Sequence, residues 1–388
     1  MADSPELRKR LKNRGYGRAD VDDRRAAVEE FSGARLEHVA AYSFDPEGAS
    51  RNVENMIGAT QIPLGFAGPV RIRGDHAEGD FIIPLATTEG ALLASISRGM
   101  SVITEAGGAH TKIYMDTMTR APVFRVDGID HATEVMAWIS ENADTLGEAV
   151  SKTTSHGRLL DIEPYPNGRN LYLRFVFDTG DAMGMNMATI ATEAACGIIE
   201  ERTGAKLVSV SGNMCTDKKP AAINILKGRG KTVLAEARIP ASVVEGRLHT
   251  TTAAVVETNY RKNLMGSAMA VSLGSNAHAA NMVAALFLAT GQDPAQVIGG
   301  SMTLTSCEDV DGDLYICVRM PNVEVGTVGG GTRLPCQSEA LSVLGCLGNG
   351  KARKFAEIVA ATVLAGELST LGAQSAGHLG KAHEALGR

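Results

Sequence analysis

The sequence has few aromatic residues and no excess of positive charge. Aromatic side chains make up 4% of the 388 residues, and the formal net charge is −6 at pH 7. Domains that bind nucleic acid usually present a basic face, so this charge balance argues against nucleic acid as a partner. Small anionic ligands are still compatible with the sequence, because they need only a local cluster of cations.

The sequence also lacks the features of a secretion signal or a membrane-spanning helix. Its first residues, 1–6, are polar and do not form the apolar core of a signal peptide. The most apolar long stretch, 264–290, is interrupted by Asn276, His278 and Asn281. No uninterrupted apolar run reaches the roughly 20 residues that a membrane-spanning helix needs. We therefore expect a soluble, cytoplasmic protein with no membrane partner.

The cysteines do not follow a metal-binding or disulfide pattern. No two of the six form a Cys-x-x-Cys pair, and none is spaced from a histidine as in zinc sites. We expect buried thiols in a reducing compartment and no bound metal. The cysteines are Cys196, Cys215, Cys307, Cys317, Cys336 and Cys346.

The composition that is present suits a globular α+β protein. Hydrophobic residues account for 44% and charged residues for 21%, which is enough to bury a large core. The element order predicts a small N-terminal helical region (1–50) and a large α/β domain (51–120 and 211–388). Between the two parts of the large domain, residues 121–210 have the order β-α-β-β-α-β, which predicts an inserted ferredoxin-like domain.

Hydrophobic periodicity places the individual elements. In the large domain we expect strands at 69–73, 80–85 and 232–239, and a helix from Ala91 to Thr104. Thr87 or Thr88 would cap this helix, so that Glu89 lies in its first turn; an acid there is also explained by the helix dipole alone. In the inserted domain we expect strands at 123–126, 159–162, 170–177 and 206–210, and helices at 131–152 and 183–202.

A short cationic loop is the most distinctive polar stretch of the chain. Asp217, Lys218 and Lys219 stand together between Thr216 and Pro220. Because a residue before proline avoids the helical region, Lys219 should be extended, and Pro220 can begin a helix. A cationic loop can stabilise negative charge on a substrate oxygen, although a solvated surface turn explains the loop taken alone.

Two glycine-containing turns are candidates for binding a phosphate or a ribose. Residues 180–186 contain two glycines where a strand leads into a helix, and residues 326–332 contain three successive glycines after a strand. Tight turns without a ligand are the alternative. Residues 227–232 resemble the end of a P-loop, but Ile225 replaces its first glycine. We therefore disfavour an NTPase and predict a hairpin turn there.

Taken together, these stretches resemble the 3-hydroxy-3-methylglutaryl-coenzyme A (HMG-CoA) reductases of the class shared by eukaryotes and many archaea. The similarity runs from about residue 50 to the end of the chain, with the motifs in the family's order. The matching stretches are 54–58 (ENMIG), 86–90 (ATTEG), 118–120 (MTR), 180–186, 211–224, 276–281, 291–293 (GQD) and 326–332.

The resemblance implies reduction of HMG-CoA to mevalonate and free CoA by two hydride transfers. It places the catalytic cation at Lys218, where it would stabilise the carbonyl oxygen, and its carboxylate partner at Asp293. Glu89 would donate a proton to the developing alcohol. His383 would protonate the departing thiolate, with His378 as the alternative.

The resemblance also implies three sets of binding residues. The substrate set is Arg120, Ser211, Asp217, Lys219 and Asn281. The CoA set is Arg98, Lys262 and His278. The nicotinamide-cofactor set is Thr154, Ser155, His156, Asp181, Met183, Gly184, Met185, Asn186, Val328, Gly329, Gly331 and Arg388.

The cofactor and the assembly are implied in the same way. Many NADPH-using relatives carry a Ser-Arg pair where this chain has Thr154-Ser155, so Arg158 or Arg388 would have to meet the 2′-phosphate. We expect NADPH, with an NADH-dependent enzyme of mevalonate catabolism as the alternative. We also expect a homodimer or homotetramer with active sites between subunits. A non-catalytic binding protein would lack one of the four catalytic residues, and all four are present.

Overall fold

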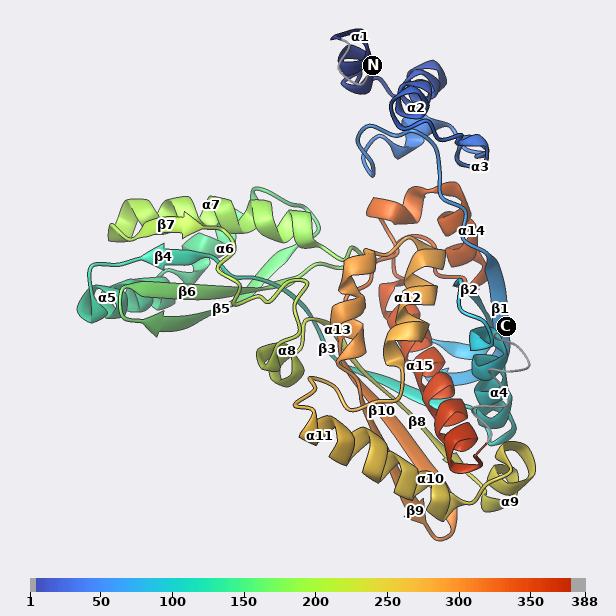
Figure 1. Cartoon of the computed structure of the whole chain (residues 1–388). Helices are drawn as coiled ribbons and strands as arrows, with labels where there is room; N and C mark the ends of the chain where they lie inside the picture. Colours follow the sequence, from blue (N-terminus) through green and yellow to red (C-terminus); the bar gives the residue numbers. More distant parts are fainter. Residues whose placement is uncertain (1–4, 378–388) are drawn as a thin grey trace.

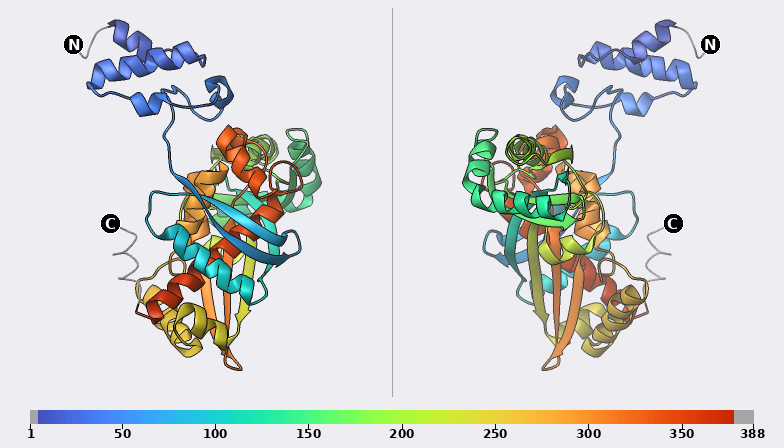
Figure 2. Two further views of the ribbon diagram at one scale, coloured as in Figure 1. Left: turned by 90° about the vertical axis from the view of Figure 1, so that its right-hand side faces the viewer. Right: turned by 90° about the vertical axis from the view of Figure 1, so that its left-hand side faces the viewer.

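The computed structural model describes residues 5–377. Figure 1 shows a helical N-terminal unit, a large body built around one long helix, and a small unit that projects from the side of the body. Figure 2 shows that the N-terminal unit extends from one end of the body and is joined to it by one extended segment of the chain. Three of the predicted site residues, His378, His383 and Arg388, lie outside the described residues.

The N-terminal unit is organised around a buried arginine. Arg24 is fully buried and donates hydrogen bonds to the carbonyl oxygens of Asn13, Gly15 and Met56. A small apolar cluster that includes Met56 packs against Leu334 of the body. The elements of this unit are α1 (Pro5–Leu11), α2 (Arg18–Ser32), α3 (Glu37–Ala40) and the 3₁₀ turn η1 (Pro46–Ala49).

The body contains a six-stranded sheet with the strand order β2-β1-β3-β8-β10-β9. Only β1 and β3 are parallel, and the other neighbours are antiparallel. The strands are β1 (Leu64–Gly74), β2 (Glu78–Ala86), β3 (Ala109–Arg120), β8 (Gly230–Ile239), β9 (Leu304–Val310) and β10 (Asp313–Val323).

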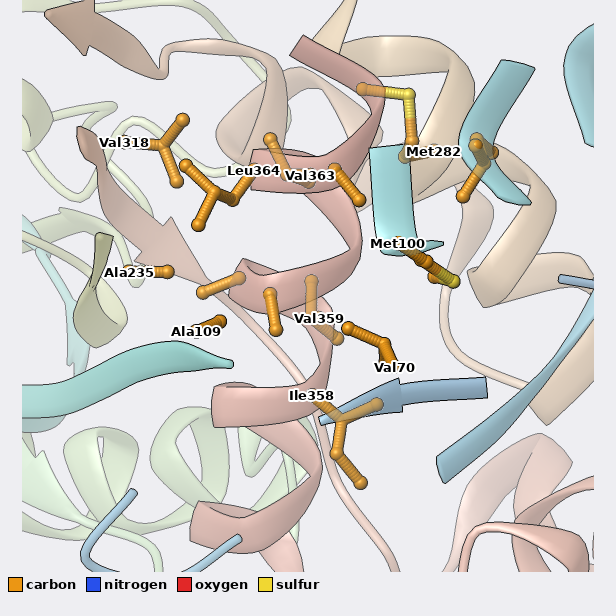
Figure 3. Packing of buried hydrophobic residues seen from close by; sticks show 14 of the residues in the cluster. Val70, Met100, Ala109, Ala235, Met282, Val318, Ile358, Val359, Val363 and Leu364 are labelled. Atoms are coloured by element: carbon orange, nitrogen blue, oxygen red, sulfur yellow. The ribbon is translucent and has the colours of Figure 1, made fainter. Parts of the chain in front are cut away.

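Helix α15 (Ala352–Ser375) forms the centre of the body. Figure 3 shows Val359, Val363 and Leu364 of this helix among side chains from β8, β10 and β1. By length and composition α15 could cross a membrane, but 94% of its most apolar window is buried inside the protein. Its apolar side chains are therefore covered by other parts of the protein. Helices α4 (Leu92–Glu105) and α12 (Ala279–Thr290) pack against it.

Shorter elements connect these parts of the body. They are α8 (Ala222–Lys227), α9 (Ala241–Val243), the π-helical turn η2 (Val244–Leu248), α10 (Thr252–Thr258), the π-helical segment η3 (Asn259–Gly266), α11 (Ser267–Met269), the 3₁₀ turn η4 (Pro294–Gln296), α13 (Val297–Ser301), the 3₁₀ turn η5 (Gly330–Arg333) and α14 (Pro335–Val343).

The small unit has an antiparallel sheet with the strand order β7-β4-β6-β5 and its own hydrophobic core. The end of β3 pairs with β6 through Met118–Arg120, so the small sheet is joined directly to the large one. The elements are β4 (Val123–Arg125), α5 (Ile129–Glu141), α6 (Ala143–Ser151), β5 (Arg158–Asn167), β6 (Asn170–Asp178), α7 (Met185–Thr203) and β7 (Lys206–Ser209).

The helix predicted at 131–152 is wrong in one respect, because the chain forms two helices there. They meet at Asn142, whose side-chain amide donates to the carbonyl oxygen of Trp138. An asparagine side chain competes with the helical backbone for hydrogen bonds, which favours a break at this position.

The helix predicted from Ala91 to Thr104 forms within one residue of that range, but its predicted cap is wrong. α4 begins at Leu92, after Ala91 in the left-handed region with φ of 66°. Thr87 instead accepts a hydrogen bond from the backbone N–H of Glu89. Glu89 therefore lies in the loop before the helix rather than in its first turn.

Three smaller predictions need correction. Helix α8 begins at Ala222, two residues after Pro220, and the chain then passes from α8 into β8 without the hairpin predicted at 227–232. Cys336 is exposed and Cys307 is only partly covered, so the cysteines are not uniformly buried.

The close approach of α4 to α15 gives a test of the packing. A methyl group added at Gly99 would overlap the backbone carbonyl oxygen of Ala365, which cannot move without shifting α15. We expect Gly99→Ala to lower the free energy of unfolding by about 1–3 kcal/mol, the usual cost of overpacking, as measured by chemical denaturation. Gly197→Ala in α7 is the matched control, because a methyl group there meets nothing within 4 Å. An unchanged stability in Gly99→Ala would contradict this packing.

Candidate functional site

The cationic loop places a lysine beside a carboxylate. The Nζ of Lys218 lies 3.1 Å from Oδ2 of Asp293. The other carboxylate oxygen of Asp293 accepts a hydrogen bond of 3.0 Å from the N–H of Ala295, at the start of η4. Lys218 has φ of 59°, which is unusual for a residue other than glycine. Its side chain is 47% exposed, so its ammonium group is available to a ligand.

Beneath this loop lies a set of buried charges that the sequence analysis did not identify. Oδ1 of Asp217 accepts one hydrogen bond of 2.9 Å from Nε2 of Gln296. The same oxygen lies 3.2 Å from Nη2 of Arg229. Arg229 is fully buried and also pairs with Glu324, whose side chain is 2% exposed. A glutamate between Val323 and Val325 was the sequence signal that could have indicated a buried ion pair.

Burial and neighbouring charges shift the pKa values of both members of this pair. Burial raises the pKa of Glu324 to about 7, while Arg229 opposes the rise and the charges of Asp217 and Asp293 add to it. Burial would lower the pKa of Arg229, but the carboxylates of Glu324 and Asp217 outweigh that effect and raise it. Arg229 is thus a fixed cation at the base of the loop.

The predicted substrate residues near the loop have different surroundings. Lys219 is exposed, and its Nζ donates to the carbonyl oxygen of Asp217 at 3.1 Å. Nε of Arg120 is buried without a hydrogen-bond partner. Ser211 lies 3.8 Å from the thiol of Cys215, measured between side-chain oxygen and sulfur. The loop is tied to the residue after Arg120, because the N–H of Gly212 donates to the carbonyl oxygen of Ala121.

A second polar cluster lies at the other end of α12. The side-chain amide of Asn281 donates to Oε1 of Glu89 at 3.2 Å and lies 3.3 Å from Nδ1 of His278. Nε2 of His278 lies 2.6 Å from the hydroxyl of Thr370 and 3.1 Å from the carbonyl oxygen of Gly366. Glu89, Asn281 and His278 therefore form one connected group.

This cluster borders a pocket of about 290 Å³, which Glu89, Arg98, His278 and Asn281 line together with residues of α15. Arg98 donates to the backbone and side-chain oxygens of Ser369 at 2.8 Å, and burial lowers its pKa. Burial also lowers the pKa of Lys262, against the opposing charge of Glu367. Two residues of the predicted CoA set, Arg98 and His278, thus form hydrogen bonds to α15, and the third, Lys262, is within reach of the charge of Glu367.

A larger groove of about 700 Å³ brings together two of the glycine-containing turns. Its lining includes Asp293, the start of α7 and the turn before η5. From the predicted cofactor set it contains Met183, Gly184, Met185, Asn186, Val328, Gly329 and Gly331. Arg51 and Asn52 of the N-terminal unit also line it, which the sequence analysis did not foresee.

Asp181 and the turn at 154–156 lie outside this groove lining. The carboxylate of Asp181 caps the start of α15, because it accepts hydrogen bonds from the N–H groups of Gly350, Lys351 and Ala352. Burial tends to raise the pKa of Asp181, but these three donors lower it overall. Both oxygens of its carboxylate thus already accept hydrogen bonds from the backbone of the protein.

The turn that would meet the 2′-phosphate is held by its own hydrogen bonds. Thr154 accepts from the N–H groups of His156 and Gly157 at 3.1 and 3.2 Å, and Ser155 and His156 are exposed. Arg158 is exposed and lines a different hollow, of about 840 Å³, on the small unit. That hollow contains none of Glu89, Lys218 and Asp293.

Within residues 5–377, no group of three or more His, Cys, Asp or Glu side chains could hold a metal ion. The polar side chains described above form two clusters, one at each end of α12. Asn281 lies near the start of this helix and Asp293 follows its end. The nine steps from residue 281 to residue 290 rise by about 14 Å, at 1.5 Å per residue. In one chain, Glu89 and Lys218 therefore belong to separate clusters.

Comparisons with known proteins agree on one family. The family model described as hydroxymethylglutaryl-coenzyme A reductase matches residues 20–388. The 3-hydroxy-3-methylglutaryl-coenzyme A reductase of Haloferax volcanii is 56% identical over 379 residues, covering 95% of this chain and 94% of that protein. The reductase of the same name from Pyrococcus horikoshii is 55% identical over 383 residues, covering 96% of this chain and 93% of that protein.

A solved structure shares the fold at much lower identity. It is the class II 3-hydroxy-3-methylglutaryl-CoA reductase of Streptococcus pneumoniae bound to NADPH, with a TM-score of 0.69 and 19% identity. The match covers 84% of this chain and 89% of that chain. At this identity the structure supports the mixed α/β fold, whereas the family model and the close relatives show that the chain belongs to the HMG-CoA reductase family.

Proposed function

We propose that this protein reduces HMG-CoA to mevalonate and free CoA, using NADPH as the source of hydride. The observation that carries the proposal is the Lys218–Asp293 pair, in which Asp293 also lines the groove between the two glycine-containing turns. A nicotinamide ring held in that groove would lie next to the lysine. The pair therefore meets the two needs of carbonyl reduction, a nearby hydride donor and a cation for the oxygen.

Lys218 would donate a hydrogen bond to the thioester carbonyl oxygen of the substrate, and then to the aldehyde oxygen of the intermediate. Negative charge develops on this oxygen as the carbonyl is reduced, so a fixed cation stabilises the transition state more than the ground state. Asp293 holds the ammonium group in place at 3.1 Å. The loss of one such donor typically costs about 3–4 kcal/mol of barrier.

Glu89 would deliver the proton that completes the alcohol. It lies in the loop before α4, hydrogen-bonded to Asn281. His383 is the proposed proton donor to the CoA thiolate, with His378 as the alternative. Both histidines lie outside the described residues.

The cofactor would occupy the groove of about 700 Å³. Gly184, with φ of 90°, precedes the first residue of α7, so N–H groups at this helix start can meet phosphate oxygens. When bound, the cofactor supplies hydride. NADPH is favoured over NADH because the fold neighbour from Streptococcus pneumoniae is described as bound to NADPH, and Arg388 or Arg158 would meet its 2′-phosphate.

The domain roles follow from this placement. Residues 121–210 would be the inserted ferredoxin-like cofactor domain, and residues 51–120 and 211–388 the substrate domain, with residues 1–50 as the N-terminal helical region. Arg98, His278 and Lys262 would bind CoA, while Arg120, Ser211, Asp217, Lys219 and Asn281 would bind the hydroxymethylglutaryl part. The protein would act in the cytoplasm, in the mevalonate pathway, without a metal.

We propose further that the active site forms between two subunits of a dimer, or of a tetramer built from dimers. The division of the site between the two ends of α12 supports this arrangement. One chain would supply Lys218 and Asp293, and its partner would supply Glu89 and Asn281. The site would then be incomplete in a single chain.

The role of Lys218 can be tested by substitution. We expect Lys218→Ala to lower kcat for NADPH oxidation with HMG-CoA by at least about 100-fold, since it removes the oxyanion donor, while calorimetry shows little change in NADPH binding. Lys227→Ala is the matched control, because Lys227 is also 47% exposed and paired with a carboxylate, that of Glu163. Retained turnover in Lys218→Ala would remove the lysine from the mechanism.

The shared site predicts complementation between inactive variants. In a mixed dimer of Glu89→Gln and Lys218→Ala subunits, one of the two sites contains both wild-type residues. We therefore expect a refolded equimolar mixture to recover about a quarter of the wild-type activity, because half of randomly formed dimers are mixed. A mixture as inactive as its two components would show that each site is built from a single chain.

A further inference from the structure

We infer that Arg229 and Glu324 are positioning residues that fix the catalytic loop from below. This inference rests on the proposed function, in which Lys218 is the catalytic cation. It assigns a task to an ion pair whose two side chains are 0% and 2% exposed and line neither the pocket of about 290 Å³ nor the groove of about 700 Å³. The pair holds the loop through Asp217, the residue next to Lys218.

The contacts form a continuous path to the lysine. Glu324 pairs with Nη1 of Arg229, and Nη2 of Arg229 lies 3.2 Å from Oδ1 of Asp217. One guanidinium group thus holds two carboxylates on two of its nitrogens. The planar fork of arginine suits this task, whereas the single ammonium group of lysine does not.

The turn η4 completes the arrangement from the other side. Asp293, immediately before η4, holds Lys218, while Gln296 at its end donates to Asp217 at 2.9 Å. Two adjacent loop residues are therefore bound to the two ends of one short turn. Arg229 adds a cation to the same carboxylate oxygen of Asp217 that Gln296 meets, so one oxygen of the loop is held both by η4 and by the buried arginine.

Stability alone does not explain why two charges are buried here. Removing a carboxylate and a guanidinium from water is costly, and apolar replacements of buried ion pairs are often as stable as the pair or more so. The loop, in contrast, needs a definite backbone position, because Asn213, Thr216 and Lys218 all have positive φ. A residue in the left-handed region is held there only by its surroundings.

Arg229 also reaches the cofactor groove. Its Nη2 contacts the sulfur of Met185, and Met185 lines the groove. The same guanidinium group is thus in contact with the groove wall and with the residue beside Lys218. It sets the position of the lysine relative to the place where hydride would be delivered.

The test uses Arg229→Lys and Glu324→Gln in the full chain. Because a small displacement of a catalytic group can cost about 100-fold in rate, we expect kcat to fall by about 10- to 100-fold in both variants. In Glu324→Gln, whose changed side chain does not line the groove, the Kd for NADPH should stay within about threefold of wild type, because the variant loses positioning of the lysine and not binding of the cofactor. Hydrogen exchange of the amides in residues 211–219 should be faster in both.

Arg24→Gln is the control for the loss of a buried arginine. Arg24 is fully buried like Arg229 but bonds to backbone oxygens of the N-terminal unit. We expect this variant to lose thermal stability without faster exchange in residues 211–219. If kcat and loop exchange in the Arg229 and Glu324 variants match wild type, or follow thermal stability alone across all three variants, the inference is wrong.

The exchange measurement separates this inference from the proposed function. A wild-type protein that oxidises neither NADPH nor NADH with HMG-CoA would refute the proposed function. Faster loop exchange in Arg229→Lys and Glu324→Gln, but not in Arg24→Gln, would still support the anchoring of the loop. An active wild-type protein with unchanged loop exchange in these variants would refute the anchoring alone.

Discussion

The ion pair between Lys218 and Asp293 is the interaction on which the site depends. Asp293 has this position because α12 ends at Thr290 and the chain then turns through Gly291, whose φ is 70°. The body of the protein fixes α12 by packing it against α15 and the large sheet. A carboxylate on a rigid element therefore determines where the ammonium group of a loop residue stands.

The core helix α15 serves both polar clusters at once. Its start is capped by Asp181, which belongs to the turn that leads into the groove of about 700 Å³. Further along, Glu367 accepts hydrogen bonds from the N–H groups of Ala277 and His278, just before α12. Buried polar groups need partners, and here the partners are backbone N–H groups next to the two hollows. The packing of one helix thus positions the groove and the proposed CoA pocket together.

Local patterns in the sequence predicted part of the fold, and a resemblance supplied the proposed site residues. Periodicity located the strand β6 and the helices α4 and α7 to within a few residues, because these elements each bury one face, whereas β5 extends five residues beyond its predicted end. The cap of α4 was not predictable in this way, since it depends on the left-handed Ala91. Arg229, Glu324 and Gln296 could not be found from spacing, because they lie far apart in the chain and meet only in the folded protein. The contribution of Arg51 and Asn52 to the groove depends on how the N-terminal unit packs, which no local pattern specifies.

The most direct test of the central claim is the stoichiometry of the complete reaction. Purified protein would be given a limiting amount of HMG-CoA and excess NADPH, and the oxidised cofactor and the released CoA thiol would be measured together. Reduction of a thioester to an alcohol needs four electrons, and each hydride carries two, so the account predicts two NADPH oxidised for each CoA released. A ratio of one would mean that reduction stops at the aldehyde, and CoA release without oxidation would mean hydrolysis; either result would contradict a site in which Lys218 supports both reductions.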